Sequence, residues 1–178
     1  GWSAGTKVTL NGKDITPQNV EAGSFCTIDR SFRDGDVVSV EFRAETRAVK
    51  FKDQGICFER GPILFSYPVP QEMVEDNAIY ANMNGKVPEE EGFACWSITP
   101  AGDWNYAYSG AEGIIDDSFV TIASDGGYPF DDAPLTLTIP ARHIDWSLKE
   151  GRYTPEMPAA GSVNALDYKD VQIKLVPY

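Results

Sequence analysis

Apolar and polar residues alternate with a period of two along much of this chain, which is typical of strands that bury one face. Lys7-Val8-Thr9-Leu10 is the first such run, and the Asn11-Gly12 pair after it readily supplies the positive φ of a tight turn. We expect the partner strand to restart at Ile15. Further strands are expected at residues 24–30, 37–43, 48–52, 56–67, 95–98, 104–108, 119–123, 135–139, 143–148 and 171–176.

The segment at residues 68–113 interrupts this regular pattern. Four prolines punctuate it, aromatic residues collect in it, and its only weak helical pattern spans residues 71–78. A structureless loop of this length is improbable in a compact domain. We therefore interpret the segment as an excursion that contains short strands near residues 95–98 and 104–108. Before it, Pro62 lies inside a strand-like run, and its missing N–H predicts a bulge or an edge position there.

Many short strands, little helix and frequent turn residues favour an all-β fold. The specific expectation is an antiparallel β-sandwich, jelly-roll-like, with a long aromatic-rich excursion. No internal repeat and no domain boundary is evident in the pattern. We expect residues 1–178 to form a single domain, with the loop-rich excursion inserted at about residues 68–113.

Composition and charge restrict the partners. No apolar run approaches the roughly 20 residues that a membrane-spanning helix needs, so we expect no membrane partner. The net charge is −12, with 27 acidic and 15 basic residues. Binding to nucleic acid depends on Lys and Arg that neutralise phosphates, so nucleic acid is not expected either. An acidic, aromatic-rich β domain is compatible with export to the periplasm or the extracellular space, although no residue requires it.

Metal ions and cofactors are not expected. Cys26, Cys57 and Cys95 have no CxxC-like spacing, and a single histidine cannot complete a zinc site with them. Cys26 and Cys57 have the apolar neighbours of small buried thiols; one disulfide with one remaining thiol is the alternative. A calcium site formed by the turn acids is a second alternative, because clustered carboxylates and carbonyl oxygens suit that ion. Its ligands would be Asp125, Asp131 and Asp132.

Candidate catalytic groups have simple structural interpretations. A glycosidase needs two acids separated across a bound sugar by about 5–10 Å, whereas neighbouring acids in turns usually bond to nearby backbone N–H groups. The sole histidine, His143, has Ser147 in its segment, but no nucleophile elbow surrounds that serine. We expect His143 to be a surface or partly buried side chain. The acid pairs are Asp34 and Asp36, Asp116 and Asp117, and Asp131 and Asp132.

Several segments resemble one family when they are read in order. DRSFRDGDVV at residues 29–38 and FERGPILFS at residues 58–66 are similar to the sandwich segment that follows the catalytic barrel in β-L-arabinofuranosidase-type glycoside hydrolases, the family 127-like enzymes that were formerly a domain of unknown function. WNYA at residues 104–107 resembles the WNYAL-type motif of that region. The segment at residues 134–146 resembles a later strand, and DVQIKLVPY at residues 170–178 resembles the family's ending.

The resemblance implies an accessory role without chemistry of its own. In that family the chemistry belongs to an α-helical barrel N-terminal to this region, with a catalytic cysteine and a zinc ion held by cysteines and a glutamate. None of that barrel is present here, and the three cysteines match no part of its zinc cluster, so no catalytic residue is carried over. We expect a non-catalytic domain that packs against and supports the (α/α) barrel of a carbohydrate-active enzyme. A free-standing carbohydrate-binding module, with an oligosaccharide as its partner, is the alternative.

The residues chosen for such contacts are aromatic and polar. Sugars present C–H faces to aromatic rings, and Asn, Asp or Arg can hydrogen-bond their hydroxyls. Aromatic residues at a period of two also fill cores and domain interfaces, so core packing, an interface with the barrel and sugar binding all remain open. Arg60 is expected to pair with a carboxylate such as Asp36 or Glu41, or to contact a catalytic domain. The set comprises Trp96, Trp104, Asn105, Tyr106, Tyr108 and Arg60.

Overall fold

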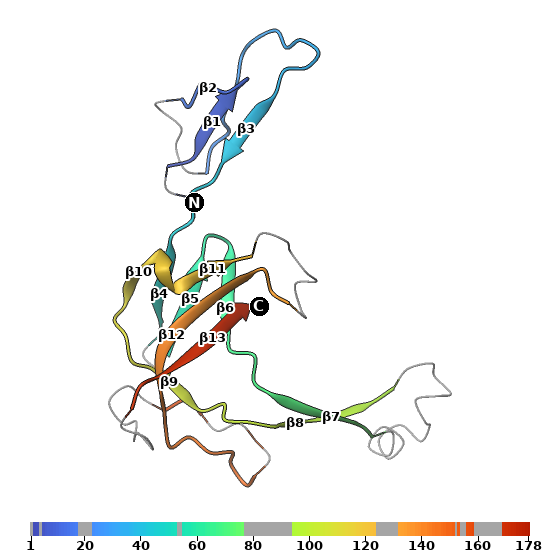
Figure 1. Ribbon diagram of the computed structural model, residues 1–178, viewed down its shortest axis with the longest axis vertical. Helices are drawn as coiled ribbons and strands as arrows, with labels where there is room; N and C mark the ends of the chain where they lie inside the picture. The colour runs from blue at the N-terminus through green and yellow to red at the C-terminus, as the bar shows by residue number, and fades with distance from the viewer. Residues whose placement is uncertain are drawn as a thin grey trace. The chain divides into compact units, whose positions relative to one another are not determined.

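The structure is a computed structural model, and nearly all of its regular structure is strand (Figure 1). It describes residues 2–3, 5–17, 23–52, 55–76, 94–123, 132–151, 153, 156–158 and 169–178. Within these ranges the only helical element is one short 3₁₀ turn, and the strand pairings are antiparallel. The predicted all-β antiparallel class is therefore confirmed.

The chain forms two compact units, each built from separated stretches of sequence. The first comprises Gly1–Phe65, Ala111–Leu135 and Pro177–Tyr178, and the second comprises Ser66–Gly110 and Thr136–Val176. We describe each unit by itself. The jelly-roll-like sandwich and the single domain with its excursion at residues 68–113 remain predictions.

The first unit begins with a three-stranded sheet in the order β2-β1-β3. β1 (Lys7–Leu10) pairs with β2 (Lys13–Asp14) and with β3 (Val38–Glu41). The turn between β1 and β2 is Asn11-Gly12, with φ of 49° and 77°. The predicted Asn-Gly turn is thus confirmed, while the partner strand restarts at Lys13 rather than at Ile15.

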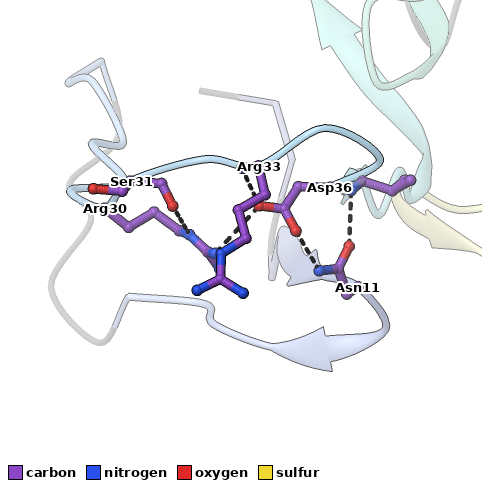
Figure 2. Close-up of polar contacts among 6 residues, drawn as sticks. Asn11, Arg30, Ser31, Arg33 and Asp36 are labelled. Atoms are coloured by element: carbon purple, nitrogen blue, oxygen red, sulfur yellow. Dashed lines mark hydrogen bonds and ion pairs between the residues drawn. The ribbon is translucent and has the colours of Figure 1, made fainter.

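Asp36 organises the loop that leads into β3 (Figure 2). Its carboxylate accepts hydrogen bonds from the Arg33 backbone N–H at 2.9 Å and from the Asn11 side-chain amide at 2.7 Å. The guanidinium of Arg30 lies 3.2 Å from the same carboxylate. These donors, with the Arg33 N–H first, lower the pKa of Asp36 below its usual value of 3.8. An acid of the DGD turn therefore has the structural role that its turn position favoured.

A second antiparallel run of strands in this unit has the order β10-β4-β5-β6. Its members are β10 (Gly113–Ile115), β4 (Thr46–Phe51), β5 (Gly55–Arg60) and β6 (Ile63–Ser66). Alternate residues lie on one buried face, where Thr46, Ala48, Phe58 and Phe65 form the core.

The β5–β6 connection corrects one expectation. Arg60 pairs with Ile63, so Gly61-Pro62 forms a two-residue hairpin turn and not a bulge or an edge position. Gly61 has a φ of 59°, and Pro62 needs no ladder partner at a turn. The Trp2 ring packs on this turn, because a Cβ on Gly61 would lie 3.0 Å from Trp2 Cε3. The hairpin and the N-terminal segment thus meet at a glycine.

The 3₁₀ turn η1 (Asp117–Phe119) and β11 (Val120–Ile122) complete the described part of the first unit. The carboxylate of Asp116 accepts a hydrogen bond of 2.8 Å from the Ser118 backbone N–H and caps this turn. Hydrogen bonding to Ser118 also lowers the pKa of Asp116. This acid is therefore a turn cap, as the sequence predicted for neighbouring acids.

The second unit is centred on β12 (Leu135–His143), which pairs with β13 (Val171–Pro177) and with β9 (Tyr106–Tyr108). Pro140 lies inside β12 opposite Gln172, and its carbonyl accepts a hydrogen bond of 3.1 Å from the Ser109 N–H. One face of these strands carries a buried core, as period-two burial requires. Its members are Leu137, Ile139, Ala141 and Leu175.

A two-stranded ribbon also belongs to the second unit. β7 (Gln71–Glu75) pairs with β8 (Trp96–Pro100), so the helical pattern expected at residues 71–78 is wrong over residues 71–75. The cause is tertiary: strand pairing with β8 outweighs a weak local helix propensity. Residues 77–78 lie outside the described residues.

Two further strand expectations are wrong. Residues 24–30 form no strand, and Phe25 within them is 98% exposed. After β12 ends at His143, residues 144–148 contain only an isolated bridge position at Ile144. In both places the alternation is short, and among the described residues it forms no strand ladder. The run expected at residues 56–67 is divided into β5 and β6 by the Gly61-Pro62 turn, and the strands expected at the other positions are present with shifted ends.

Candidate functional site

The six predicted site residues do not form one site. Trp104, Asn105 and Tyr106 lie together in the second unit, and Tyr108 lies on the same strand face as Tyr106. Trp96 lies on the β7–β8 ribbon, where it is half exposed, and Arg60 belongs to β5 of the first unit. We define the aromatic–histidine cluster as Tyr67, Asp103, Trp104, Asn105, Tyr106, His143 and Trp146.

Asn105 connects the parts of this cluster. Its side-chain N–H donates to the carbonyl oxygen of Ile144, and its side-chain oxygen lies 2.9 Å from Nε2 of His143. Its backbone oxygen also accepts from the Ile144 N–H at 2.9 Å. Because the amide oxygen can only accept, Nε2 of His143 carries the hydrogen of this bond. Both ends of the amide are thus used inside the protein.

Aromatic rings surround this hydrogen-bonded pair. The rings of Trp104 and Trp146 have centroids 4.9 Å apart and are tilted by 58°. The Tyr106 ring meets Tyr67 edge-on at 5.5 Å and lies 5.7 Å from the His143 ring. Burial, followed by Tyr67 and Asp103, raises the pKa of Tyr106. Tilted and edge-on contacts of this kind are typical of packed aromatic cores.

His143 has one charged neighbour. Its Nε2 atom lies 3.9 Å from Oδ1 of Asp103, whose side chain is exposed. Protonation of the imidazole would make this an ion pair, and with Nε2 bonded to Asn105 the second ring nitrogen is the other proton site. The arrangement orients the ring. His143 contacts the Asn105 amide, the Asp103 carboxylate and the ring of Tyr106, and this set includes no serine hydroxyl or thiol that it could activate as a nucleophile.

Sequence reasoning missed four members of the cluster as site residues. His143 was expected only as a surface or partly buried side chain, and Trp146 was noted only as part of a family-like segment. Tyr67 and Asp103 were not selected. The missing information is the register of β9 on β12, which places His143 opposite Tyr106. No local pattern specifies which strand will pair with β9.

Trp146 has an unusual polar atom. Its indole Nε1–H is buried, and it has no acceptor within the part of the chain that the structure describes. Most buried donors in native proteins are paired. The indole ring is therefore held at this position by its packing on Trp104 and not by a hydrogen bond.

Arg60 has a structural role on the buried face of its sheet. Its Nη1 atom donates to Thr46 Oγ1 at 2.8 Å and to the Asp117 carboxylate at 2.7 Å. Thr46 is fully buried, whereas the side chain of Asp117 is largely exposed. The expected partners Asp36 and Glu41 are not the ones found. The carboxylate partner of Arg60 is Asp117, and this pairing depends on the position of η1 beside β5.

The outer face of the β10-β4-β5-β6 sheet is apolar. The register puts Ile114 beside Arg47, Arg47 beside Glu59, and Glu59 beside Leu64. Val49 and Phe51 extend the same face along β4. The exposed fractions of its four large apolar side chains lie between 37% and 69%. Both faces of this sheet therefore carry apolar residues, a pattern usual for sheets covered on both sides.

The three cysteines lie in separate parts of the described structure. Cys26, Cys57 and Cys95 are thiols and not disulfides, and Cys26 is exposed, contrary to the expected buried position. Cys26 follows the almost fully exposed Phe25 in the segment that forms no strand. Within the described ranges no group of three or more metal-binding side chains is close enough to hold an ion. Of the proposed calcium ligands, Asp125 and Asp131 lie outside the described residues.

Comparisons with known proteins give little information. No model of a protein family matches the sequence, and no curated protein is similar to it. Across the described ranges, no helix has the length and apolar character needed to cross a membrane.

Several solved chains resemble this one, among them the structure of a glycoside hydrolase at low similarity. It is a GH127 β-L-arabinofuranosidase from Geobacillus stearothermophilus T6, with a TM-score of 0.41 and 16% sequence identity. The match covers 100% of this chain and 22% of that chain. The chain thus spans about a fifth of the length of that enzyme. Similarity at this level establishes neither a common fold nor a common function.

Proposed function

We propose that this chain is a non-catalytic β domain of a carbohydrate-active enzyme and that it packs against the catalytic domain. The apolar outer face of the β10-β4-β5-β6 sheet carries this proposal. Isolated surface apolar residues need no explanation, but four large exposed apolar side chains around one charged pair on a single sheet face are typical of an interaction site. The ordered sequence resemblance to the arabinofuranosidase-type sandwich supplies the enzyme class. Its matching segments contain no catalytic residue of that family.

The geometry of the outer face suits a domain interface. Ile114, Val49, Phe51 and Leu64 surround the facing pair Arg47 and Glu59. Domain interfaces commonly combine an apolar centre with a few charged pairs. Arg47 also donates to Glu45 at 2.7 Å, and this bond is the main cause of the raised pKa of Arg47. The guanidinium is therefore already held by carboxylates of its own chain, which leaves the apolar side chains to contact the partner.

The test is co-expression with an arabinofuranosidase-type catalytic barrel. We expect a complex that survives purification and a barrel whose melting temperature is higher when the domain is bound. Leu64→Asp and Ile114→Asp on the outer face should each weaken the complex about tenfold or more. Thr121→Asp, at an exposed position outside that face, is the matched control. Failure of the wild-type chain to bind, or equal weakening by Thr121→Asp, would contradict the proposal.

A second function, oligosaccharide binding, is supported by the aromatic–histidine cluster. Trp104 and Trp146 pack together, and Asp103, which precedes Trp104 in the sequence, has an exposed carboxylate that could accept hydrogen bonds from a sugar. Asn105 would not contribute, because its amide is used internally. A fluorescence titration with a panel of plant and host glycans tests this. Binding should disappear in Trp104→Ala and persist in Trp96→Ala, and a flat response to every glycan would reject this function.

A further inference from the structure

The N-terminal sheet has an apolar face that its own chain covers only in part. The register places Val8 opposite Val40 and Leu10 opposite Val38, so these four side chains share one face. Val8 and Leu10 are buried, whereas Val38 and Val40 are exposed. A hollow of about 680 Å³ opens beside this face. Its lining residues include Trp2, Val8, Thr16, Ile28, Val40 and Phe42.

The polar groups that line this hollow are already used. Thr16 Oγ1 accepts from the Val8 N–H at 2.9 Å and lies 3.3 Å from the Val8 carbonyl oxygen. Ser3 Oγ accepts from Thr6 Oγ1 at 3.0 Å and from the Arg43 N–H at 3.1 Å. Few hydrogen-bonding groups therefore remain for a polar ligand such as a sugar. The hollow suits an apolar occupant.

The surroundings of this face are less acidic than the rest of the chain. Residues 1–43, which end before β4, contain 5 of the 15 basic residues and 6 of the 27 acidic ones. Lys13 pairs with Leu10 and so lies on the apolar face itself. Arg43 packs against Gly5, which lines the hollow. A complementary partner would present apolar side chains together with carboxylates.

The β7–β8 ribbon of the same chain has this complementary character. Met73 pairs with Ile98 and Glu75 pairs with Trp96, so these four side chains share one ribbon face. The three apolar members are 48–56% exposed. Glu72 and Asp76 add to the negative charge, and residues 61–85 contain no Lys or Arg. An isolated two-stranded ribbon is marginally stable in water, so its exposed apolar face favours a partner.

We propose that the β7–β8 ribbon of one copy docks on the apolar face of the N-terminal sheet of a second copy. The apolar side chains of the ribbon enter the hollow, and the carboxylate of Glu75, on the same ribbon face, lies toward Lys13 and Arg43. Such a contact joins two different surfaces, so it continues head to tail and does not close as a symmetric pair. It uses surfaces other than the outer face assigned to a catalytic domain and is therefore independent of that proposal.

Sedimentation equilibrium of the whole chain tests the contact. The average mass should rise above the 19.6 kDa of one chain as the protein concentration increases. Added salt should weaken this rise, because it screens the attraction of Glu75 to Lys13 and Arg43. Val40→Asp on the sheet and Ile98→Asp on the ribbon should each weaken association about tenfold or more. Circular dichroism spectra confirm that each variant keeps its strands. Ser39→Asp and Thr99→Asp, on the opposite faces of the same strands, should associate like the wild type.

A mixture of the two disrupted variants gives the decisive result. Val40→Asp retains an intact ribbon and Ile98→Asp retains an intact sheet, so the pair should form a one-to-one complex that grows no further. A wild-type chain that stays monomeric would overturn the proposal and leave the hollow to another occupant. Association of the wild type without a complex in the mixture would also overturn it. So would equal loss of association in Ser39→Asp and Val40→Asp.

Discussion

The side-chain amide of Asn11 donates a hydrogen bond of 2.7 Å to the carboxylate of Asp36, which lies 25 residues later in the chain. The oxygen of the same amide accepts a bond of 2.8 Å from the Val37 N–H. Asn11, a turn residue, therefore holds both the Asp36 carboxylate and the Val37 backbone at the entry to β3. The arrangement favours an ionised carboxylate, because Asp36 accepts the bond from Asn11 and the bond from the Arg33 N–H.

This relationship predicts a loss of stability in acid. The pKa of Asp36 is lowered in the folded state, first by the Arg33 N–H and then by Asn11, while the unfolded chain titrates near the usual 3.8. A lowered folded pKa stabilises the fold above the unfolded value, and the contribution disappears as the pH falls through the folded pKa. Asp36→Asn should therefore lower the melting temperature at neutral pH, and the difference from the wild type should shrink below about pH 4.

Thermal unfolding followed by circular dichroism across this pH range measures the effect. Asp34→Asn, two residues away in the same turn, is the control and should stay close to the wild type throughout. A melting-temperature difference for Asp36→Asn that stays constant from neutral to acidic pH would contradict the assigned role.

Gly61→Ala should destabilise the protein through two separate causes. Its φ of 59° lies in the left-handed region, where an L side chain costs about 1–2 kcal/mol. Its Cβ would also approach Trp2 Cε3 at 3.0 Å and the Ala44 Cβ at 3.2 Å. Gly12→Ala separates the causes, since Gly12 also has a positive φ of 77° but no atom near its Cβ position.

A double-mutant cycle with Trp2→Ala measures the steric part. In urea unfolding, Gly61→Ala should cost more free energy than Gly12→Ala, and the excess should fall when Trp2 is removed. Equal costs for the two alanine substitutions would mean that Trp2 does not pack on the turn.

Asn105→Ala should destabilise the second unit. The substitution removes the donor to the carbonyl of Ile144, a residue that is only 4% exposed, together with the acceptor for His143. Loss of a partner for a buried polar group costs about 1–3 kcal/mol. Near-ultraviolet circular dichroism should also change, because Trp104 and Tyr106 adjoin Asn105. Gln172→Ala, at an exposed position on β13, should shift the free energy of unfolding by less than about 0.5 kcal/mol.

Leu137→Ala tests where the core of the second unit lies. Leu137 is fully buried and pairs with Leu175 across β12 and β13. Truncation at such a position costs about 2–5 kcal/mol, because the removed atoms leave a cavity. Val171→Ala, near one end of β13 and partly exposed, is the matched truncation. Similar losses for the two variants in denaturant unfolding would show that Leu137 is not central.

Strand positions were accessible from the sequence wherever alternation was combined with a turn signal. The run at residues 7–10 coincides with β1, because Asn11-Gly12 ends it and supplies two positive φ angles. β13 was also located within one residue of its ends. The segment at residues 24–30 alternates as well, yet it joins no strand ladder among the described residues and stays irregular. Alternation of apolar and polar residues indicates that a segment can form a strand. Whether a second strand lies beside it depends on the whole fold.

The candidate site was less accessible because its members come from separate segments. Asn105 and Tyr106 were selected for their local sequence, but the partner of Asn105 is His143, 38 residues away. Arg60 was given carboxylate partners from its own half of the chain, whereas Asp117 lies 57 residues further on. Such pairs depend on strand register and on the placement of η1. Neither follows from residue type or spacing.

Pro140 has a consequence for the solubility of the protein. On the side of β12 that faces β9, the Pro140 carbonyl is already occupied by the Ser109 N–H, and the proline nitrogen has no hydrogen to donate. A foreign strand that reached this side of β12 between β9 and β11, which both pair with β12, would find no donor at Pro140 and an acceptor already taken. Proline at such a place blocks the edge-to-edge addition that leads to aggregates. Pro140 thus acts as a gatekeeper on one of the longest strands of an otherwise strand-rich protein.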